Sequence, residues 1–436
     1  MRAKSPKFCY FQANVLQEIK IRINDEKFKK TFRLAEGKFE RKRKFPFEKL
    51  MAFLLSVTGR SLQREIDSFF EALGHNDVSL PLTKGAVSKA RSYLDPQAFK
   101  SLNQDALSMF YQHPQAQRWK GHIVKAVDGS TTLLPEVHES VKKEFQATSF
   151  GPKSTSKRHI SRISIMSDVL NGVVCNSEMA PYTTDENCLA REHIKQINEG
   201  DLVLFDRQYE SYDLMLRILE KGGHFCVRMR EGWWKEVRKL MNGKEKERIV
   251  KVDLPVKKYG DRASSITLRF LKMKDKTGKT RVFCTSLLDT KKYSRISIAN
   301  LYKKRWRVEE DFKTVKCALS LVNFSGHTSI AIRQDFYSKT LLLTLNRILL
   351  FKVKPQLKKV AKKVAKSNKK VKVNITYTLG RLKKWFLTMW DKSLDILQWI
   401  KEFTARASLI FEYTNEGNQY QRKFKREPYN YCNKNL

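Results

Sequence analysis

The sequence has no run of apolar residues long enough to cross a membrane. A helical span needs about 20 consecutive apolar residues, and the most apolar stretch, near 341–351, is interrupted by Asn346 and Arg347. The chain begins Met-Arg-Ala-Lys and has no apolar signal core at that end. These features exclude a membrane span and a membrane partner, and the seven scattered cysteines predict a reducing, cytosolic compartment.

Cysteine and histidine are few and scattered. The seven cysteines include no C-x-x-C pair, and the eight histidines include no H-x-x-x-H spacing. This pattern fits neither a disulfide framework nor a zinc ribbon or a histidine-based zinc site. Any metal ion would therefore have to be held by carboxylates.

Acidic residues are also few in comparison with basic residues. The 436 residues include 86 Lys and Arg but only 45 Asp and Glu, which gives a net charge of +41. Because 41% of the residues are hydrophobic, the chain has enough apolar surface to fold and is not a disordered basic tail. The excess of positive charge predicts a polyanionic partner.

Residues 1–120 show helical spacing of apolar residues and form the predicted N-terminal DNA-binding region. Thr83 is a plausible N-cap, and the helix after it would place Lys84, Ser88 and Arg91 on one face. Such a face suits recognition of DNA ends. The alternative is a solvated surface helix.

From about residue 121 the pattern changes to that of an α/β domain. Residues 122–128 are typical of a half-buried strand, and 163–169 and 173–179 flank Asn171-Gly172, a strong hairpin signal. A helix is expected at 184–197 and a short strand at 201–206. This order predicts a sheet of mixed direction.

The predicted catalytic domain comprises 121–228 and 295–350. Between these parts, 229–294 contains short β-type runs and many turn residues, which predicts a β-rich insertion. Residues 351–436 form a basic helical C-terminal region, in which 352–372 carries ten lysines along an apolar helical stripe.

Two aspartates close predicted strands. Asp128 and Asp206 would emerge at the same edge if their strands are neighbours in one sheet, and paired carboxylates there can hold hard cations. The alternative is local: Asp128-Gly129-Ser130 forms an ordinary turn with an Asx hydrogen bond, and Asp206 pairs with Arg207.

A third carboxylate lies in a predicted helix. Tyr302, Arg305, Glu309 and Lys316 have offsets of 0, 3, 7 and 14. In a regular helix these positions fall within roughly 60° of one another over about 21 Å. The stripe suits phosphate binding beside a carboxylate, and a simple surface charge network is the alternative.

These motifs together resemble those of the DDE transposases of bacterial insertion sequences, specifically the insertion-sequence-four family. The spacing from Tyr302 to Lys316 matches the family signature, and Asp128-Gly129-Ser130 and Asp206-Arg207-Gln208-Tyr209 resemble its two aspartate motifs. The resemblance covers about 120–340. It implies a ribonuclease H-like mixed sheet with helices, interrupted by the β-rich insertion and flanked by N- and C-terminal helical regions.

The resemblance also implies the chemistry. Asp128, Asp206 and Glu309 would hold two Mg²⁺ ions, for which Mn²⁺ can substitute, and would catalyse cleavage and strand transfer. Tyr302, Arg305, Lys316 and Arg207 would bind phosphates. The implied partners are double-stranded DNA, as element ends and target, and a second copy in a homodimeric synaptic complex. The implied location is the bacterial cytoplasm, on the nucleoid when DNA is bound.

One departure and two alternatives remain. Some relatives stack a flipped base on a tryptophan in the strand before the signature helix, but 281–284 contains none. Trp233 and Trp234 could stack a base or pack in the core. The same carboxylates would serve a nuclease without strand transfer, whereas a DNA-binding derivative without catalysis is disfavoured because all three are present.

Overall fold

The computed structural model describes residues 6–41, 45–74, 82–135, 138–149, 157–232, 234–274, 278–351, 353, 370–391 and 393–414. The chain forms two compact units. The first comprises Met1–Pro114, Thr132–Ile160 and Lys313–Leu436, and the second comprises Gln115–Thr131 and Ser161–Phe312. The predicted N- and C-terminal regions thus belong to one unit. Within the described residues, no helix is long and apolar enough to span a membrane.

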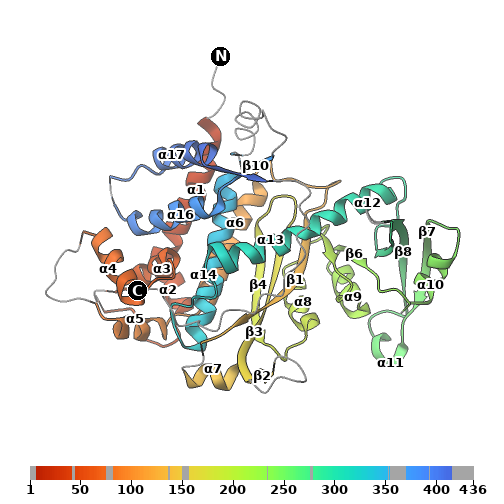
Figure 1. Cartoon of the computed structure of the whole chain (residues 1–436), viewed down its shortest axis with the longest axis horizontal. Helices are drawn as coiled ribbons and strands as arrows, with labels where there is room; N and C mark the ends of the chain where they lie inside the picture. Colours follow the sequence, from red (N-terminus) through yellow and green to blue (C-terminus); the bar gives the residue numbers. More distant parts are fainter. Residues whose placement is uncertain are drawn as a thin grey trace, which may run out of the picture. The chain divides into compact units, whose positions relative to one another are not determined.

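The first unit is mainly helical (Figure 1). Its helices are α1 (Pro6–Asn24), α2 (Glu26–Phe32), α3 (Phe47–Ser56), α4 (Leu62–Ala72), α5 (Lys84–Arg91), α6 (Gln97–Gln112), α7 (Glu139–Glu144), α14 (Ser329–Leu350), α16 (Ile375–Thr388) and α17 (Ile396–Leu409). Its short strands are β2 (Ala147–Ser149), β10 (Lys370–Val373) and β11 (Phe411–Thr414).

Helix α14 is the centre of this unit. It is buried around its whole circumference, because α3, α6, α16 and α17 all pack against it. A helix that is apolar on every side requires such complete cover. Of the lysine-rich segment 352–372, only Val353 and 370–372 are described. Residues 370–372 belong to β10, which pairs antiparallel with β11.

The second unit is built on a mixed sheet. Its strands are β1 (Val124–Leu133), β3 (Lys157–Asp168), β4 (Val174–Pro181), β5 (Leu202–Phe205), β6 (His224–Arg228), β7 (Glu247–Asp253), β8 (Ser265–Lys274) and β9 (Thr280–Thr285). The order is β3-β1-β5-β6-β9-β8-β7, with β4 on the other side of β3. Strands β1, β5 and β6 run parallel to their neighbours in this trio. The first residues of β3 also pair with β2, within the first unit.

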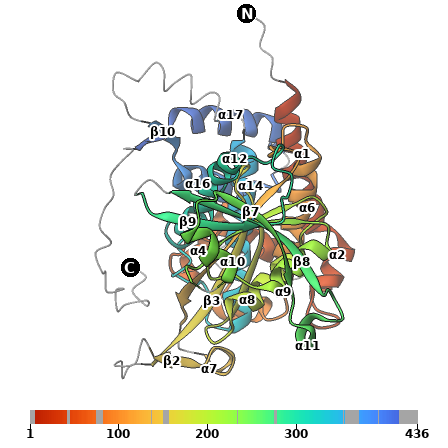
Figure 2. The same ribbon diagram turned by 90° about the vertical axis from the view of Figure 1, so that its right-hand side faces the viewer.

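The β-type runs expected in 229–294 form β7, β8 and β9, which lie side by side (Figure 2) and continue the sheet from β6. The predicted end of the first strand needs a correction. Strand β1 continues to Leu133, so Asp128 does not end it. The unit's helices are α8 (Glu186–Ile194), α9 (Tyr212–Glu220), α10 (Lys235–Asn242), α11 (Val256–Tyr259), α12 (Arg295–Tyr302) and most of α13 (Arg307–Lys313).

The hairpin prediction is confirmed. Strands β3 and β4 pair antiparallel around Asn171-Gly172, and Gly172 adopts a φ of +79°, a conformation that favours glycine. A side chain at Gly172 would also collide with the Arg307 guanidinium, which covers this turn. The start of α13 is thereby packed against the hairpin.

Candidate active site

Asp128 and Asp206 lie at matching positions on neighbouring parallel strands. The register pairs Val124 with Leu202 and Ala126 with Leu204. Two residues further along each chain, Asp128 and Asp206 therefore reach the same level of the sheet. This register is the arrangement that the sequence analysis expected if the two strands are neighbours. Local Asx hydrogen bonds are present as well, from the Gly129 amide to Asp128 (2.9 Å) and from the Gln208 amide to Asp206 (2.8 Å).

The third carboxylate is tied to the first by an arginine. Arg305 donates from Nη1 to Asp128 Oδ2 at 3.3 Å and from Nη2 to Glu309 Oε1 at 3.0 Å. The guanidinium thus bridges two of the three predicted metal ligands, and its contact with phosphate stays a prediction. Without a compensating cation, these carboxylates would repel each other.

The pKa of Asp128 reflects the charges of the other two carboxylates. Burial raises this pKa most, Arg305 and the Gly129 amide lower it, Asp206 and Glu309 add to the rise, and the resulting pKa is about 6. A buried carboxylate that feels two like charges is unstable in its ionised form. An additional positive charge at this site would therefore stabilise the ionised carboxylates.

Tyr302 has a different role from the one expected. Its hydroxyl donates to the Phe205 carbonyl oxygen at 2.9 Å, and its ring packs on Phe283 with the centroids 4.6 Å apart. The single O–H group of Tyr302 is thus used by the backbone and is not available to a phosphate. The contact anchors the end of α12 to the end of β5, directly before Asp206.

The signature segment is not one regular helix. Helix α12 ends at Tyr302, Lys303–Trp306 form a 3₁₀ turn, α13 follows, and Thr314–Ala318 form a π-helical turn. These turns have different numbers of residues per turn, so the single stripe expected from a constant angle per residue is not maintained. Lys316 lies in the π-helical turn, in the first unit.

The residues present fit a divalent metal ion in chemistry. Asp128, Asp206 and Glu309 offer carboxylate oxygens, the ligands that Mg²⁺ prefers. Among the described residues, however, no three His, Cys, Asp or Glu side chains converge tightly enough to hold an ion as they stand. Arg305 bridges Asp128 and Glu309 instead.

The predicted recognition face on α5 is only partly correct. Thr83 caps the helix, accepting from the Ala86 amide, and Lys84 and Ser88 are exposed. Arg91 is 2% exposed and forms an ion pair with Asp335 at 2.7 Å. The residues before and at the start of α14 cover the last turn of α5, which removes Arg91 from the solvated face.

Sequence reasoning missed a group of residues around Asp128. A Cβ atom on Gly129 would lie 3.0 Å from the Glu186 carboxyl carbon, so a larger residue there would require the Glu186 side chain to shift. Glu186 is paired with Arg162, and the buried Tyr209 hydroxyl lies close enough to Glu186, Asp128 and Asp206 to feel their charge. Nothing in the sequence singles out Glu186, since an acidic residue in a first helical turn is common.

A basic pocket follows the end of β5. It has a volume of about 400 Å³ and is lined by Arg207, Gln208, Arg228, Met229, Arg230, Glu231 and Lys279. The predicted phosphate-binding residue Arg207 is exposed at its wall. Trp234 packs against Tyr212 and Phe270, with centroids 4.5 and 6.0 Å away, as the core alternative predicted, and Trp233 lies outside the described residues.

The family described as Transposase DDE domain matches residues 119–345, more than half of the chain. The chain belongs to the DDE transposase family. The recognition of an insertion-sequence-four transposase from its motifs is confirmed. This transposase is accordingly an enzyme of DNA cleavage and strand transfer.

Several known proteins are similar to this chain. The transposase is 22% identical over 330 residues to Transposase InsG for insertion sequence element IS4 of Escherichia coli (strain K12), covering 73% of each chain. It is 29% identical over 157 residues to Putative transposase y4zB of Sinorhizobium fredii (strain NBRC 101917 / NGR234), covering 35% of this chain and 43% of that protein. A solved piggyBac transposase synaptic complex with hairpin DNA has a TM-score of 0.40 and 13% identity, covering 98% of this chain and 89% of that one.

Proposed function

We propose that this transposase binds the terminal inverted repeats of an insertion sequence and cuts and joins DNA by two-metal phosphoryl transfer. The observation that carries the proposal is the shared level of Asp128 and Asp206 on parallel strands, with Glu309 linked to Asp128 through Arg305. The mixed sheet around these residues supports the ribonuclease H-like fold that the family resemblance implies.

Asp128, Asp206 and Glu309 are the residues that would hold the two Mg²⁺ ions, for which Mn²⁺ would substitute. Such ions lower the pKa of an attacking hydroxyl and stabilise a leaving oxygen. In the proposed reaction Arg305 releases Asp128 and Glu309 as their charge is neutralised. Its planar guanidinium then becomes available for bidentate binding of a phosphate. Tyr302 keeps the signature segment on the end of β5 throughout.

The basic pocket supports a DNA backbone path beside Asp206. Burial lowers the pKa of Arg228, and the nearby Arg281 and Arg207 also lower it. The Arg228 Nε atom is buried and has no hydrogen-bond partner among the described residues. An anion would satisfy this donor and relieve the repulsion among the arginines. A phosphate of double-stranded DNA, from an element end or a target, is the proposed ligand.

The proposal extends to the assembly. Two element ends must be held together for transposition, so we propose a homodimer in the synaptic complex. Lys84 and Ser88, which are exposed on α5, stay candidates for contact with the repeat sequence, and Lys316 stays a candidate for contact with phosphate.

The decisive experiment separates cleavage from binding. Asp128→Ala, Asp206→Ala and Glu309→Ala should each abolish cleavage of end-bearing DNA and leave end binding within a few fold, because each removes a metal ligand. Glu309→Gln should act in the same way, since a neutral amide does not balance a divalent ion. Glu310→Gln, a change at the adjacent exposed glutamate, is the matched control.

Cleavage by any of the three alanine variants at a near wild-type rate would contradict the assignment of the triad. Cleavage by the wild type without joining to a target plasmid would indicate a nuclease in place of a transposase.

A further inference from the structure

A serine hydroxyl holds the backbone of Asp128 from the neighbouring strand. Ser164, on β3, is 1% exposed, and its Oγ atom donates to the Asp128 carbonyl oxygen at 3.1 Å. Successive side chains of a strand point to opposite faces of the sheet. Because the Cβ position of Gly129 lies against Glu186 of α8, the Asp128 carboxylate lies on the face away from α8. Ser164 therefore contacts the peptide group of Asp128 and not its carboxylate.

A buried histidine binds the same hydroxyl. His193, on α8, is fully buried, and its Nε2 atom lies 2.9 Å from Ser164 Oγ. The His193 Nδ1 atom lies 3.1 Å from Asn176 Nδ2, and this amide group also donates to Glu178 Oε1 at 2.9 Å. A continuous chain of hydrogen bonds thus runs from β4 through α8 and β3 to Asp128 on β1.

The direction of each hydrogen bond follows from the groups themselves. The Asp128 carbonyl only accepts, so it takes the single hydroxyl proton of Ser164, and Ser164 Oγ must accept from His193 Nε2. At the other end, the Asn176 Nδ2 group only donates, so His193 Nδ1 must accept. Both ends assign the same neutral tautomer of His193, with its proton on Nε2. The Glu178 carboxylate fixes the orientation of the Asn176 amide, because the opposite orientation would place two acceptors in contact.

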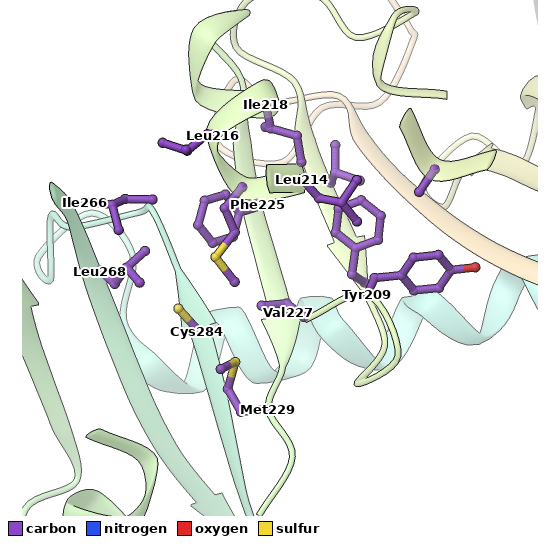
Figure 3. Close-up of a cluster of buried hydrophobic side chains, with 14 of the residues drawn as sticks. Tyr209, Leu214, Leu216, Ile218, Phe225, Val227, Met229, Ile266, Leu268 and Cys284 are labelled. Atoms are coloured by element: carbon purple, nitrogen blue, oxygen red, sulfur yellow. The ribbon is translucent and has the colours of Figure 1, made fainter. Parts of the chain in front are cut away.

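The surroundings of this chain are apolar. Figure 3 shows part of a cluster of buried hydrophobic side chains from α9 and the sheet, to which Ala190 and Ile194 of α8 also belong. These two residues flank His193 on the helix, and Val127, directly before Asp128, is a further member of the cluster. Because the linked side chains are buried beside this cluster, water does not replace a hydrogen bond that is lost there.

Strand β1 depends on β3 at the level of Asp128. The paired residues of β1 and β5 end at Ala126 and Leu204, and β5 itself ends at Phe205. Asp128 thus lies beyond the part of β1 that pairs with β5, and Ser164 attaches it to β3 on the other side.

We propose that Ser164 and His193 are positioning residues of the metal site, which fix the Asp128 backbone so that its carboxylate stays at the level of Asp206. His193 orients the Ser164 hydroxyl, and this hydroxyl holds Asp128. This inference rests on the proposed metal-dependent function. Neither residue touches the ion, and both act through the backbone of a ligand.

The competing explanation is that the chain of hydrogen bonds only joins α8 to the β3–β4 hairpin. In that case, breaking it would lower the stability of the metal-free protein and leave the Mn²⁺ affinity of the folded protein unchanged.

Calorimetric titration of the full-length protein with Mn²⁺ separates the two explanations. Ser164→Ala removes the hydroxyl, and we expect Mn²⁺ affinity to fall about tenfold. Ser167→Ala is the matched control, because Ser167 lies on the same strand, is equally buried, and has a hydroxyl without a hydrogen-bond partner among the described residues. Its Mn²⁺ affinity should equal that of the wild type. Wild-type Mn²⁺ affinity in folded Ser164→Ala would overturn the inference.

Nitrogen-15 NMR of histidine-labelled protein tests the role of His193 in the wild type, and so does not depend on the folding of Ser164→Ala. The neutral tautomer with its proton on Nε2 is expected, and His193→Gln identifies the signal by its loss. His193→Leu removes the donor to Ser164 and should lower Mn²⁺ affinity several-fold. A proton on Nδ1, or undiminished Mn²⁺ affinity in His193→Leu, would overturn the role of His193.

Asp206→Asn, measured in parallel, distinguishes this failure from failure of the proposed function. If Asp206→Asn weakens Mn²⁺ binding and Ser164→Ala does not, the positioning role is wrong and the triad stands. If neither variant alters Mn²⁺ binding, or if the wild type binds no Mn²⁺, the metal site itself is wrong.

Discussion

The pKa of Asp128 links the candidate site to the stability of the protein. Its pKa of about 6 lies above the usual value of 3.8, mainly because of burial. Between pH 4 and 6 the folded protein therefore holds a proton that the unfolded chain releases. Stability from this group is present below about pH 4 and is lost as the pH rises through 6.

We therefore predict that Asp128→Asn raises the free energy of unfolding at pH 7.5, in the absence of metal, by on the order of 2 kcal/mol. At pH 4 the two proteins should have similar stability, because Asp128 is then neutral. Urea unfolding across this pH range measures the difference. Saturating Mg²⁺ should stabilise the wild type and not the variant. If the free energies of unfolding of the two proteins differ by the same amount at every pH, burial does not raise the pKa of Asp128.

At the level of single residues, sequence analysis predicted the positions of the two aspartates better than the contacts of Tyr302 and Arg305. Asp128 and Asp206 follow from strand patterning, because parallel neighbours in register bring equivalent positions together. Tyr302 and Arg305 were assigned to phosphate, yet the structure gives them to a backbone carbonyl and to two carboxylates. The type of a residue determines which groups its side chain is able to bind. The tertiary structure determines which of those groups lie within contact distance.

At the level of elements, Arg91 joins two helices that are far apart in the sequence. Its guanidinium donates to Gln334, to Ser325, to the Ala331 carbonyl and to Asp335, all near the start of α14. Gly326 leaves room for it, since a Cβ atom there would lie 3.0 Å from Arg91 Nη1. Burial raises the pKa of Asp335, but Arg91 and other neighbours outweigh this effect and the pKa is lowered.

Arg91→Ala should therefore act on stability and not primarily on DNA recognition. It leaves the Asp335 carboxylate buried without its main counter-charge, and removal of one partner of such a pair costs about 3–5 kcal/mol. Urea unfolding measures the loss. Lys84→Ala, on the exposed face of the same helix, should change stability by less than about 0.5 kcal/mol. Equal stabilities of the Arg91→Ala variant and the wild type would mean that the α5–α14 connection is dispensable.

Elements with strong local signals were predicted well, and irregular ones were not. The Asn171-Gly172 turn and the strands around it follow from turn chemistry and alternation. The 3₁₀ and π-helical turns around α13 have no such signal, because a single turn is too short for its apolar spacing to distinguish the three helix types. Arg91 illustrates the same limit: α5 is exposed at its first turn and covered at its last.

On the scale of the whole molecule, hydrophobic patterning identified the strands and not their partners. The sequence predicts β7, β8 and β9 as a β-rich insertion, and only the structure shows that β9 pairs with β6 and so continues the central sheet. The N- and C-terminal helices, separated by the sheet in sequence, belong to one unit because both supply cover for α14. An apolar face in the sequence indicates that another element packs against it, but it does not identify that element.

Net charge is the remaining property of the whole chain, and it governs how binding depends on salt. Each phosphate contact contributes about 0.9 to the magnitude of the slope of log K against log salt. With a net charge of +41, we predict a slope of at least about 5 in magnitude for DNA. Titrations by fluorescence anisotropy at several salt concentrations measure it. A nearly flat plot would mean that the positive charge serves another partner.

The contribution of the basic pocket can be isolated within this total. Arg228→Gln should lower the magnitude of the slope by about 1, because it removes one buried, unpartnered donor from a single phosphate. Arg238→Gln removes the same charge from an exposed position on α10 and should leave the slope unchanged. Both variants have the same net charge, so equal slopes would attribute the salt dependence to overall charge. Unequal slopes in the predicted direction would place a phosphate in the pocket beside Asp206.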